Sequence, residues 1–558
     1  MGSTSRAGWR RLGAGALALA LLAGACGGGD DEEGGNDEET NDTGVVAPED
    51  EGAPTPGGDL VYALEAENSG GYCLPEAQLA ISGMQVARTI YDTLTAPDAE
   101  GNIEPFLAES VEGNETFDTW TIKVREGVTF HDGSPLDAQV VANNLDAYRG
   151  EYEARSPLLF TFVFSNIDTV TVTDPMTVTV TTKTPWPAFP WFLFGSGRVG
   201  ILAQAQLDDA ETCDRELIGT GPFMLDEWTV NQSFKAVKNP DYWGTDADGN
   251  QLPYLDSIEY RPVPDGAQRV NLLQSGEVDV IHTATASQID SLRSLGDDID
   301  LIESDAYGEV GYFMLNTAPD TVFSSLTARQ AAAHAIDRER LNAVRGLDIP
   351  TIAAGPFGPG SMGFLEDSGY PEYDLEKAKE LVAQYEQESG NDFSITLSNT
   401  TDPDTVATGD MLEEMLTEAG IDVNRNQFEQ AQLINNALGG TFDMLQWRNH
   451  PGGDPDGQYN WWATGSPVNF GKIDDPELQA LLDAGRTETD PEARTAIYED
   501  LNRRFAEQLY NLWQSYTIWA IGSDPSVSGV MGPLLPSGGE PFPGLATGHP
   551  VSGIWLSE

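Results

Sequence analysis

The residues best suited to ligand chemistry lie between positions 443 and 462. A short apolar stretch, 443–447, runs into a loop rich in Gly, Pro and Asp, and two tryptophans follow the loop. Flat apolar faces with a few directed polar groups are typical of small-molecule sites. The composition therefore predicts a binding rim, with these candidate residues: Trp447, Arg448, Asn449, His450, Asp454, Asp456 and Trp461. The alternative is that the aromatic side chains form a core and that Asp454-Pro455-Asp456 is a plain turn.

Motifs of enzyme chemistry are absent or incomplete in the sequence. It has no His-Glu-x-x-His, no Gly-x-Ser-x-Gly and no Gly-x-x-x-x-Gly-Lys. Residues 195–200 match Gly-x-Gly-x-x-Gly, but they lie far inside the chain and outside a clear strand-helix-strand unit, so we expect no dinucleotide site. Residues 246–250 resemble part of a calcium loop, but Gly249 comes too early for that loop, so a turn is favoured. We predict no catalytic residue, no metal site and no cofactor.

The charge and composition of the chain limit which classes of molecule it can bind. The chain has 558 residues, with 90 Asp or Glu against 29 Lys or Arg and a net charge of -61. Such a surface repels polyanions, so nucleic acid is excluded as a partner, and the acidity fits a protein kept soluble in high salt. Hydrophobic residues make up 40% of the chain, which indicates a folded protein, and its length predicts two or three packed units.

The N-terminus reads as an export signal. Arg6, Arg10 and Arg11 precede an apolar run, 12–22, that is too short for a membrane span. The run ends in Leu-Ala-Gly-Ala-Cys, which resembles a bacterial lipobox, so residues 1–26 are interpreted as a lipoprotein signal with lipidation at Cys26. Residues 27–56 are acidic and nearly free of apolar side chains, as expected for a disordered tether. This interpretation predicts a protein anchored by lipid at the outer face of the cell membrane, with no membrane-spanning segment. The alternative is that residues 1–26 are an ordinary secretory signal in which Cys26 is not lipidated.

Two further cysteines remain after Cys26. Cys73 and Cys213 form an even pair in an exported chain, and an oxidising compartment permits a disulfide between them. Two separate buried thiols are the alternative.

Strand and helix patterns alternate along the body of the chain. Period-two alternation predicts strands at 57–64, at 120–124 and on both sides of the turn Asp174-Pro175 within 169–182. Helical spacing of apolar residues predicts helices at these ranges: 81–94, 137–148, 328–344, 375–388 and 491–508. Interleaved strands and helices indicate a mixed α/β class.

The order of short motifs resembles one known family. The chain is similar to the extracytoplasmic solute-binding proteins of ABC importers, family 5, which includes dipeptide-, oligopeptide- and nickel-binding proteins. The matching runs, in family order, are GDLVY (58–62), IYDTL (90–94), PFLAES (105–110), VREGVTFHDG (124–133), GTGPF (219–223), KNPDYW (238–243), PYLD (253–256), QSGEVD (274–279), RQAAAHAIDR (329–338) and DPD (454–456).

The resemblance implies a two-lobed periplasmic-binding-protein fold, type II-like, with an extra subdomain inserted in the first lobe. Lobe I would comprise 57–310 and the return segment 516–558, and lobe II would comprise 311–515, with hinges near 307–316 and 512–519. It implies a monomer that closes on a small-molecule or peptide ligand and delivers it to ABC permease subunits, without turnover. Tyr72 and Asn316 complete the predicted ligand-binding set.

One position departs from the family pattern. In peptide-binding relatives an Asp three residues after the corresponding Trp holds the ligand's ammonium group, and here that position is His450. A mostly neutral imidazole supplies no full negative charge. A peptide is the first expectation for the ligand, and an oligosaccharide stacked on tryptophans or a metal chelate is the alternative. A lipid-anchored hydrolase and a surface receptor without transport are the alternatives of a different class.

Overall fold

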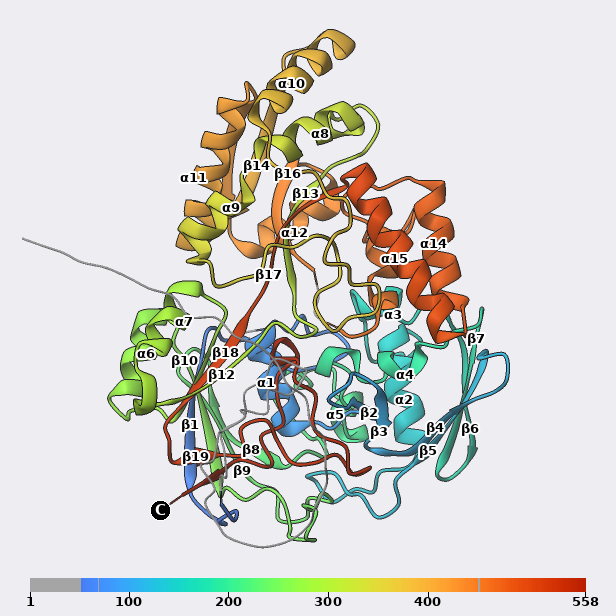
Figure 1. Ribbon diagram of the computed structural model, residues 1–558. Coiled ribbons are helices and arrows are strands. Elements are labelled where there is room, and N and C mark those ends of the chain that lie inside the picture. The colour runs from blue at the N-terminus through green and yellow to red at the C-terminus, as the bar shows by residue number, and fades with distance from the viewer. Residues whose placement is uncertain (1–51, 69, 450–451, 558) are drawn as a thin grey trace, which may run out of the picture. The chain divides into compact units, whose positions relative to one another are not determined.

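The computed structural model describes residues 52–68, 70–449 and 452–557 (Figure 1). Cys26, most of the predicted tether and His450 lie outside the described residues. The predicted mixed α/β class is confirmed: helices surround two large sheets and a smaller antiparallel sheet.

The first large sheet has seven strands. Its order is β12 (Asp300–Ser304), β18 (Trp519–Ser523), β11 (Val280–Thr283), β1 (Asp59–Leu64), β10 (Ser257–Pro262), β9 (Ser233–Lys238) and β8 (Phe223–Thr229). Side chains of β1 alternate between two apolar clusters because successive residues of a strand point to opposite faces. Tyr62 packs in the cluster shared with α1 (Ile81–Ile90), whereas Ala63 packs in a separate cluster with α6 (Gly266–Gln274) and α7 (Ala286–Arg293).

A smaller sheet is inserted between β1 and β8 in the sequence. Its four antiparallel strands are β4 (Ala108–Gly113), β5 (Thr119–Val124), β7 (Thr177–Thr182) and β6 (Ile167–Asp174). Val178 and Val180 of β7 are buried while Thr177, Thr179 and Thr181 are partly exposed, as the alternation predicts. The same segment contains the short pair β2 (Thr95–Pro97) and β3 (Ile103–Pro105), and the helices α2 (Ala138–Arg149), α3 (Phe160–Val163), α4 (Phe189–Phe192) and α5 (Gln204–Asp208).

The second large sheet has five strands. Its order is β15 (Asp422–Phe428), β14 (Ser394–Thr400), β16 (Met444–Arg448), β13 (Val310–Leu315) and β17 (Asn511–Tyr516). Helices cover both faces, and they are α8 (Leu326–Ala335), α9 (Arg338–Leu341), α10 (Leu375–Ser389), α11 (Pro403–Glu418), α12 (Gln430–Gly439), α13 (Tyr459–Trp462), α14 (Pro476–Thr487) and α15 (Pro491–Gln508).

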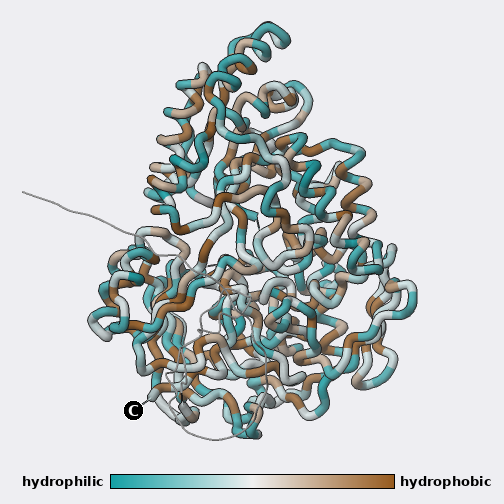
Figure 2. Tube along the Cα trace, viewed as in Figure 1, coloured by the Kyte–Doolittle hydropathy of each residue, from teal (hydrophilic) through white to brown (hydrophobic). Residues whose placement is uncertain are grey.

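Strand β13 separates the two helix layers of this second part. Phe313 and Leu315 pack with α8, α10 and α11, whereas Tyr312 and Met314 pack on the other face with α14 and α15. Figure 1 shows these two groups of helices on either side of the strands. Figure 2 shows hydrophobic residues along the strands, while the outer end of α10 is mostly hydrophilic.

We call the part built on the seven-stranded and four-stranded sheets lobe I, and the part built on the five-stranded sheet lobe II. The chain passes between them twice, through 305–309 from β12 to β13 and through 517–518 from β17 to β18. The strands β19 (Val527–Ser528) and β20 (Trp555–Leu556) pair with each other after the second crossing. The exact lobe boundaries 57–310, 311–515 and 516–558 stay a prediction.

Several predicted elements match the structure closely, and two differ. The helix predicted over 81–94 ends at Ile90, because Tyr91 has an extended backbone. Helix α15 spans 491–508 as predicted, and Asp137 caps α2 by accepting a hydrogen bond from the Val140 backbone N–H. The single helix predicted over 328–344 is wrong. It is interrupted after Ala335, because the Asp337 side chain accepts a hydrogen bond from the Arg340 backbone N–H and so begins a new short helix, α9.

Cys73 and Cys213 are joined by a disulfide that links positions separated by 140 residues in the sequence. The bond lies in lobe I, and both cysteines are buried in its core. Within the described ranges, we find no helix that combines the length and apolar character needed to cross a membrane.

Candidate ligand-binding site

The predicted rim begins where strand β16 ends. Trp447 and Arg448 are the last two residues of β16, and their backbone pairs with Tyr312 and Gly311 of β13. Because Trp447 and Tyr312 are directly opposite each other in this register, their side chains lie on the same face of the sheet.

An aromatic recess lies beside this strand end in lobe II. Its free volume in this conformation is about 30 Å³, room for about two water molecules. Its lining residues are Tyr312, Met314, Trp447, Arg448, Asn449, Gln458, Trp461, Trp462, Val468, Phe470, Gly471, Ile473 and Asn511. Phe470 meets both predicted tryptophans edge to face, with ring centroids 5.9 Å from Trp447 and 5.6 Å from Trp461. The structure thus brings Trp447, Arg448, Asn449 and Trp461 together.

Asn449 fixes the start of the loop. Its side chain is buried, accepts a hydrogen bond from the Val310 backbone N–H at 2.5 Å, and donates one to the Pro356 carbonyl at 3.1 Å. Since Val310 opens β13, Asn449 ties the loop to the first crossing between the lobes. Its amide is therefore satisfied within the protein, although it also lines the recess.

The two loop aspartates have protein partners. Arg494 of α15 donates to both carboxylate oxygens of Asp454 at 2.7 Å. Asp456 is buried and accepts from Arg486 Nε of α14 at 2.8 Å and from the Trp186 indole N–H at 2.7 Å. Charge-assisted bonds of this kind hold a loop in one conformation. Asp454 lines a second, smaller recess together with Asn449 and Gln458, but the Asp456 side chain is enclosed.

Trp186 brings lobe I into contact with this loop. It lies just before α4 and is fully buried, with its ring 4.5 Å from Phe192. The Asn460 side chain of lobe II also donates to the Phe162 carbonyl of lobe I at 2.9 Å. The segment that carries the predicted rim therefore contacts the inserted subdomain directly.

Charged groups around the strand ends form pairs. Arg448 is half exposed and lies 3.1 Å from a carboxylate oxygen of Glu309. Glu65, the residue after β1, lies 3.2 Å from Arg269. Burial raises the pKa of the Glu65 carboxyl, and the positive charges of Arg269 and Arg448 oppose this shift. Glu65 of lobe I and Arg448 of lobe II thus interact electrostatically across the two lobes.

Two predicted site residues lie elsewhere. Tyr72 is buried in the core of lobe I, where its ring packs against Trp228 and Phe234 at 5.3 and 5.8 Å. Asn316 is buried after the opposite end of β13 and donates to the Gly440 and Phe442 carbonyls. Neither side chain lines the recess, so we assign both a structural role. His450 lies outside the described residues.

Sequence reasoning did not identify Tyr312, Gln458 and Phe470 as lining residues. Tyr312 belongs to an unbroken buried strand, β13, whose sequence has no polar residue to mark a site. Phe470 is close in sequence to the predicted rim, so extending the rim through the aromatic residues after Trp462 would have included it.

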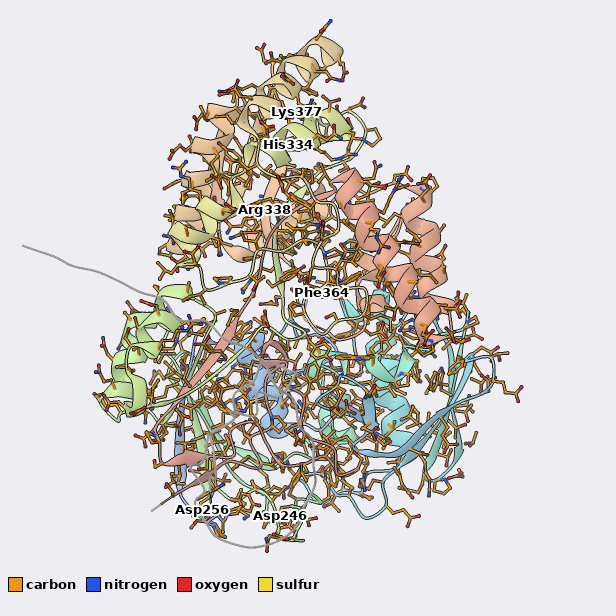
Figure 3. All side chains as sticks on the ribbon, viewed as in Figure 1. Asp246, Asp256, His334, Arg338, Phe364 and Lys377 are labelled. Atoms are coloured by element: carbon orange, nitrogen blue, oxygen red, sulfur yellow. A yellow bond between two sulfur atoms is a disulfide. The ribbon has the colours of Figure 1, made fainter. Side chains whose placement is uncertain are left out.

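Two further polar residues, His131 and Asp246, have structural roles. His131 accepts from the Gly219 backbone N–H through Nδ1 at 3.3 Å, and its other ring nitrogen lies 3.0 Å from the Gly221 carbonyl. Burial lowers the pKa of His131 to about 4, so the ring is neutral near pH 7. Asp246, labelled in Figure 3, accepts hydrogen bonds from the backbone of Asp248 and Asn250 and from the Tyr254 hydroxyl, as a turn residue does. In the described part of the chain no group of three or more His, Cys, Asp or Glu side chains is arranged to hold a metal ion.

Comparison with models of known protein families shows which family the chain belongs to. A family model described as bacterial extracellular solute-binding proteins, family 5 middle, matches residues 102–470. The chain belongs to this family. The family resemblance predicted from the sequence is thereby confirmed.

Curated relatives and solved structures extend the match. The glutathione-binding protein GsiB of Salmonella paratyphi A is 31% identical over 315 residues, which are 56% of this chain and only 58% of that relative. The structure of AgaA from Agrobacterium tumefaciens R10 in complex with agropinic acid matches with a TM-score of 0.77 and 25% identity, and covers 90% of this chain and 99% of AgaA. The structure of DppA from Helicobacter pylori with the peptide STSA also has a TM-score of 0.77, at 22% identity, over 90% of this chain and 99% of DppA. These neighbours confirm the two-lobed periplasmic-binding-protein fold.

Proposed function

We propose that this protein captures a small-molecule ligand between its two lobes and delivers it to the permease of an ABC importer. A peptide is the first candidate for this ligand. The observation that carries the proposal is the aromatic recess at the end of β16, placed on a loop that also contacts lobe I. A ligand held there by groups of both lobes binds the closed form better and therefore shifts the population toward it. No covalent step is required of the protein.

The test is native mass spectrometry of the protein after gentle purification, followed by small-angle scattering with the compound so identified. We expect a bound compound of unchanged mass and a smaller radius of gyration when it is present. A peptide, an oligosaccharide and a metal chelate are distinguished by the bound mass. Chemical conversion of the compound by the purified protein would instead support the hydrolase alternative.

Anchoring by lipid is a further part of the proposal. The lipobox-like residues before Cys26 and the acidic segment after it support a lipoprotein held at the outer face of the membrane. Expression of Cys26→Ser in a native-like host is expected to release a monomeric protein into the medium. Continued partitioning of this variant into detergent would contradict lipid anchoring.

A further inference from the structure

The disulfide of lobe I has a positively charged neighbour. Nη1 of Arg155 lies 3.0 Å from Cys73 Sγ, the sulfur that Cys73 contributes to its bond with Cys213. The arginine side chain is only 2% exposed, so this contact lies inside the protein. A disulfide sulfur is uncharged and accepts hydrogen bonds weakly, so it offsets little of the free energy that burial of a cation costs.

The other contacts of Arg155 satisfy its guanidinium only in part. Nη2 donates to the Asp209 carbonyl at 2.7 Å, and Nε is buried without a hydrogen-bond partner among the described residues. A carboxylate oxygen of Glu76 lies 3.8 Å from Nη1, and this side chain is 36% exposed, so water screens its charge. The guanidinium is therefore a strong partner for any negative charge that forms on Cys73.

A surface turn covers the other sulfur of the bond. Cys213 belongs to residues 209–216, which form no helix or strand, and residues 209–211 and 215–216 are exposed. The Thr212 hydroxyl of this turn is buried without a hydrogen-bond partner in the described part of the chain. Segments with few such contacts open locally at low free-energy cost. Opening of the turn gives a reagent access to Cys213 Sγ while Cys73 stays beside Arg155.

We propose that the bond between Cys73 and Cys213 is a thiol–disulfide exchange site for a dithiol reductant, in which Arg155 stabilises Cys73 as the leaving thiolate. A cation beside a cysteine favours the thiolate over the thiol. A more stable thiolate is a better leaving group, and a more stable reduced form makes a disulfide easier to reduce. Neither cysteine lines the aromatic recess, so this site is separate from the ligand-binding site.

The exchange proceeds in two displacements. One thiolate of the dithiol attacks Cys213 Sγ, the S–S bond breaks, and its electron pair leaves on Cys73 Sγ beside Arg155. The second thiolate of the dithiol then displaces Cys213, which takes a proton from solvent. The protein disulfide gains two electrons, and the dithiol is oxidised to its own disulfide. One proton is released overall when Cys73 remains a thiolate, and none is released when Cys73 is protonated.

The experiment compares five proteins in a Cys26→Ser background, which leaves Cys73 and Cys213 as the only cysteines of the chain. These are the otherwise wild-type protein, Arg155→Gln, Arg155→Lys, Glu76→Gln and Arg149→Gln. Glu76→Gln keeps an oxygen for the Ser156 backbone N–H but removes the negative charge that competes for Arg155. The control Arg149→Gln removes a cation of α2 that is bonded to Asp146 and to the Asp168 carbonyl.

Each protein is equilibrated with mixtures of reduced and oxidised dithiothreitol at one salt concentration, from about pH 6 to about pH 8.5, which is the ordinary pKa of a cysteine thiol. Free thiols are trapped with a maleimide and counted by mass spectrometry, which gives the equilibrium constant of exchange. Far-UV circular dichroism checks that the reduced proteins stay folded.

We expect the exchange constant of the wild type to rise within this pH range, by about tenfold per pH unit where Cys73 is a thiolate. Near pH 8 it should exceed that of Arg155→Gln by at least about tenfold, because the variant lacks the cation beside the sulfur. Arg155→Lys should restore part of the difference. Glu76→Gln should shift the constant in the opposite direction, and Arg149→Gln should behave as the wild type.

An exchange constant of Arg155→Gln equal to that of the wild type at every pH would overturn the role of Arg155. A similar loss in Arg149→Gln would also contradict it, since the effect would then follow from net charge alone. Should Arg155→Gln fail to fold, the wild type still decides the question. A wild-type constant that does not change with pH below about 8.5, or a bond that stays oxidised at every dithiol ratio, would refute the exchange site.

Discussion

The contact between Trp186 and Asp456 predicts a measurable loss of stability in Trp186→Phe. The indole N–H donates to a buried carboxylate at 2.7 Å, and a hydrogen bond to a charged group contributes about 1.5–3 kcal/mol. Phenylalanine keeps an aromatic face toward Arg486, whose guanidinium lies 5.7 Å from the indole ring, and Asp456 keeps its bond to Arg486. The change therefore removes the hydrogen bond and shrinks one buried ring.

A second tryptophan isolates the hydrogen bond from the loss of ring volume. Trp513 is almost fully buried, but its indole nitrogen has no hydrogen-bond partner among the described residues. Trp513→Phe thus removes the same atoms without removing a bond. We expect Trp186→Phe to be less stable than Trp513→Phe by about 2 kcal/mol, or roughly 30-fold in the unfolding equilibrium constant.

The assay is urea unfolding followed by far-UV circular dichroism, with the disulfide intact and the salt concentration fixed. The urea midpoints of the variants are compared with one shared slope for the dependence of unfolding free energy on urea concentration. Coincidence of the transition with that of a second spectroscopic probe checks that both variants unfold in one step. Asp456→Asn should cost more than Trp186→Phe, because it also breaks the buried pair with Arg486. Equal midpoints for the two tryptophan variants would refute the claim that this bond stabilises the contact between the inserted subdomain and lobe II.

Three further predictions concern the disulfide, pH and salt. Replacing Cys73 and Cys213 together by serine should lower the free energy of unfolding by about 2–5 kcal/mol, measured by urea unfolding, and an unchanged midpoint would argue against the bond. Burial lowers the pKa of His549 to about 4. The unfolded chain therefore binds a proton at this residue below about pH 6.5, whereas the folded protein binds it only near pH 4. The free energy of unfolding should consequently fall as the pH is lowered from about 6.5 to about 4. His549→Gln should reduce that slope by up to about 1.4 kcal/mol per pH unit, and an identical slope in both proteins would contradict a neutral buried ring. Because the net charge is -61, the melting temperature should rise with NaCl concentration as repulsion is screened, and a flat or falling dependence would count against this explanation.

Local patterns predicted the local elements well. The alternating valines on either side of Asp174-Pro175 predicted the hairpin of β6 and β7, and the apolar spacing of 491–508 predicted α15. These elements are specified by residues that are neighbours in the chain. Asp337 was the local signal that a longer helix is interrupted, since its capping bond competes with continuation of α8.

Predictions that depend on distant partners were less successful. Asp454 and Asp456 have the residue type of a ligand-binding rim, but Arg494 and Arg486, on two later helices, bind their carboxylates. Tyr72 was included in the predicted site, yet its ring packs on Trp228 and Phe234 far along the chain. A single sequence does not show which of its many carboxylates and aromatic rings bind partners elsewhere in the protein. The segment that borders the recess could therefore be predicted, but the contacts of its individual side chains could not.

The position of β18 constrains the order in which the chain can fold. This strand, Trp519–Ser523, lies inside the seven-stranded sheet and pairs with both β11 and β12. Lobe I, which is synthesised first, therefore lacks an interior strand until almost the whole chain has emerged. In contrast, the five strands of the second sheet, β13 to β17, follow one another in the sequence with no strand of another sheet between them. Pairing across more than two hundred residues is slow, because the loop must close before the contacts stabilise it. Chains truncated before residue 519 should thus leave two strand edges unpaired and prone to aggregation, although the second lobe is complete.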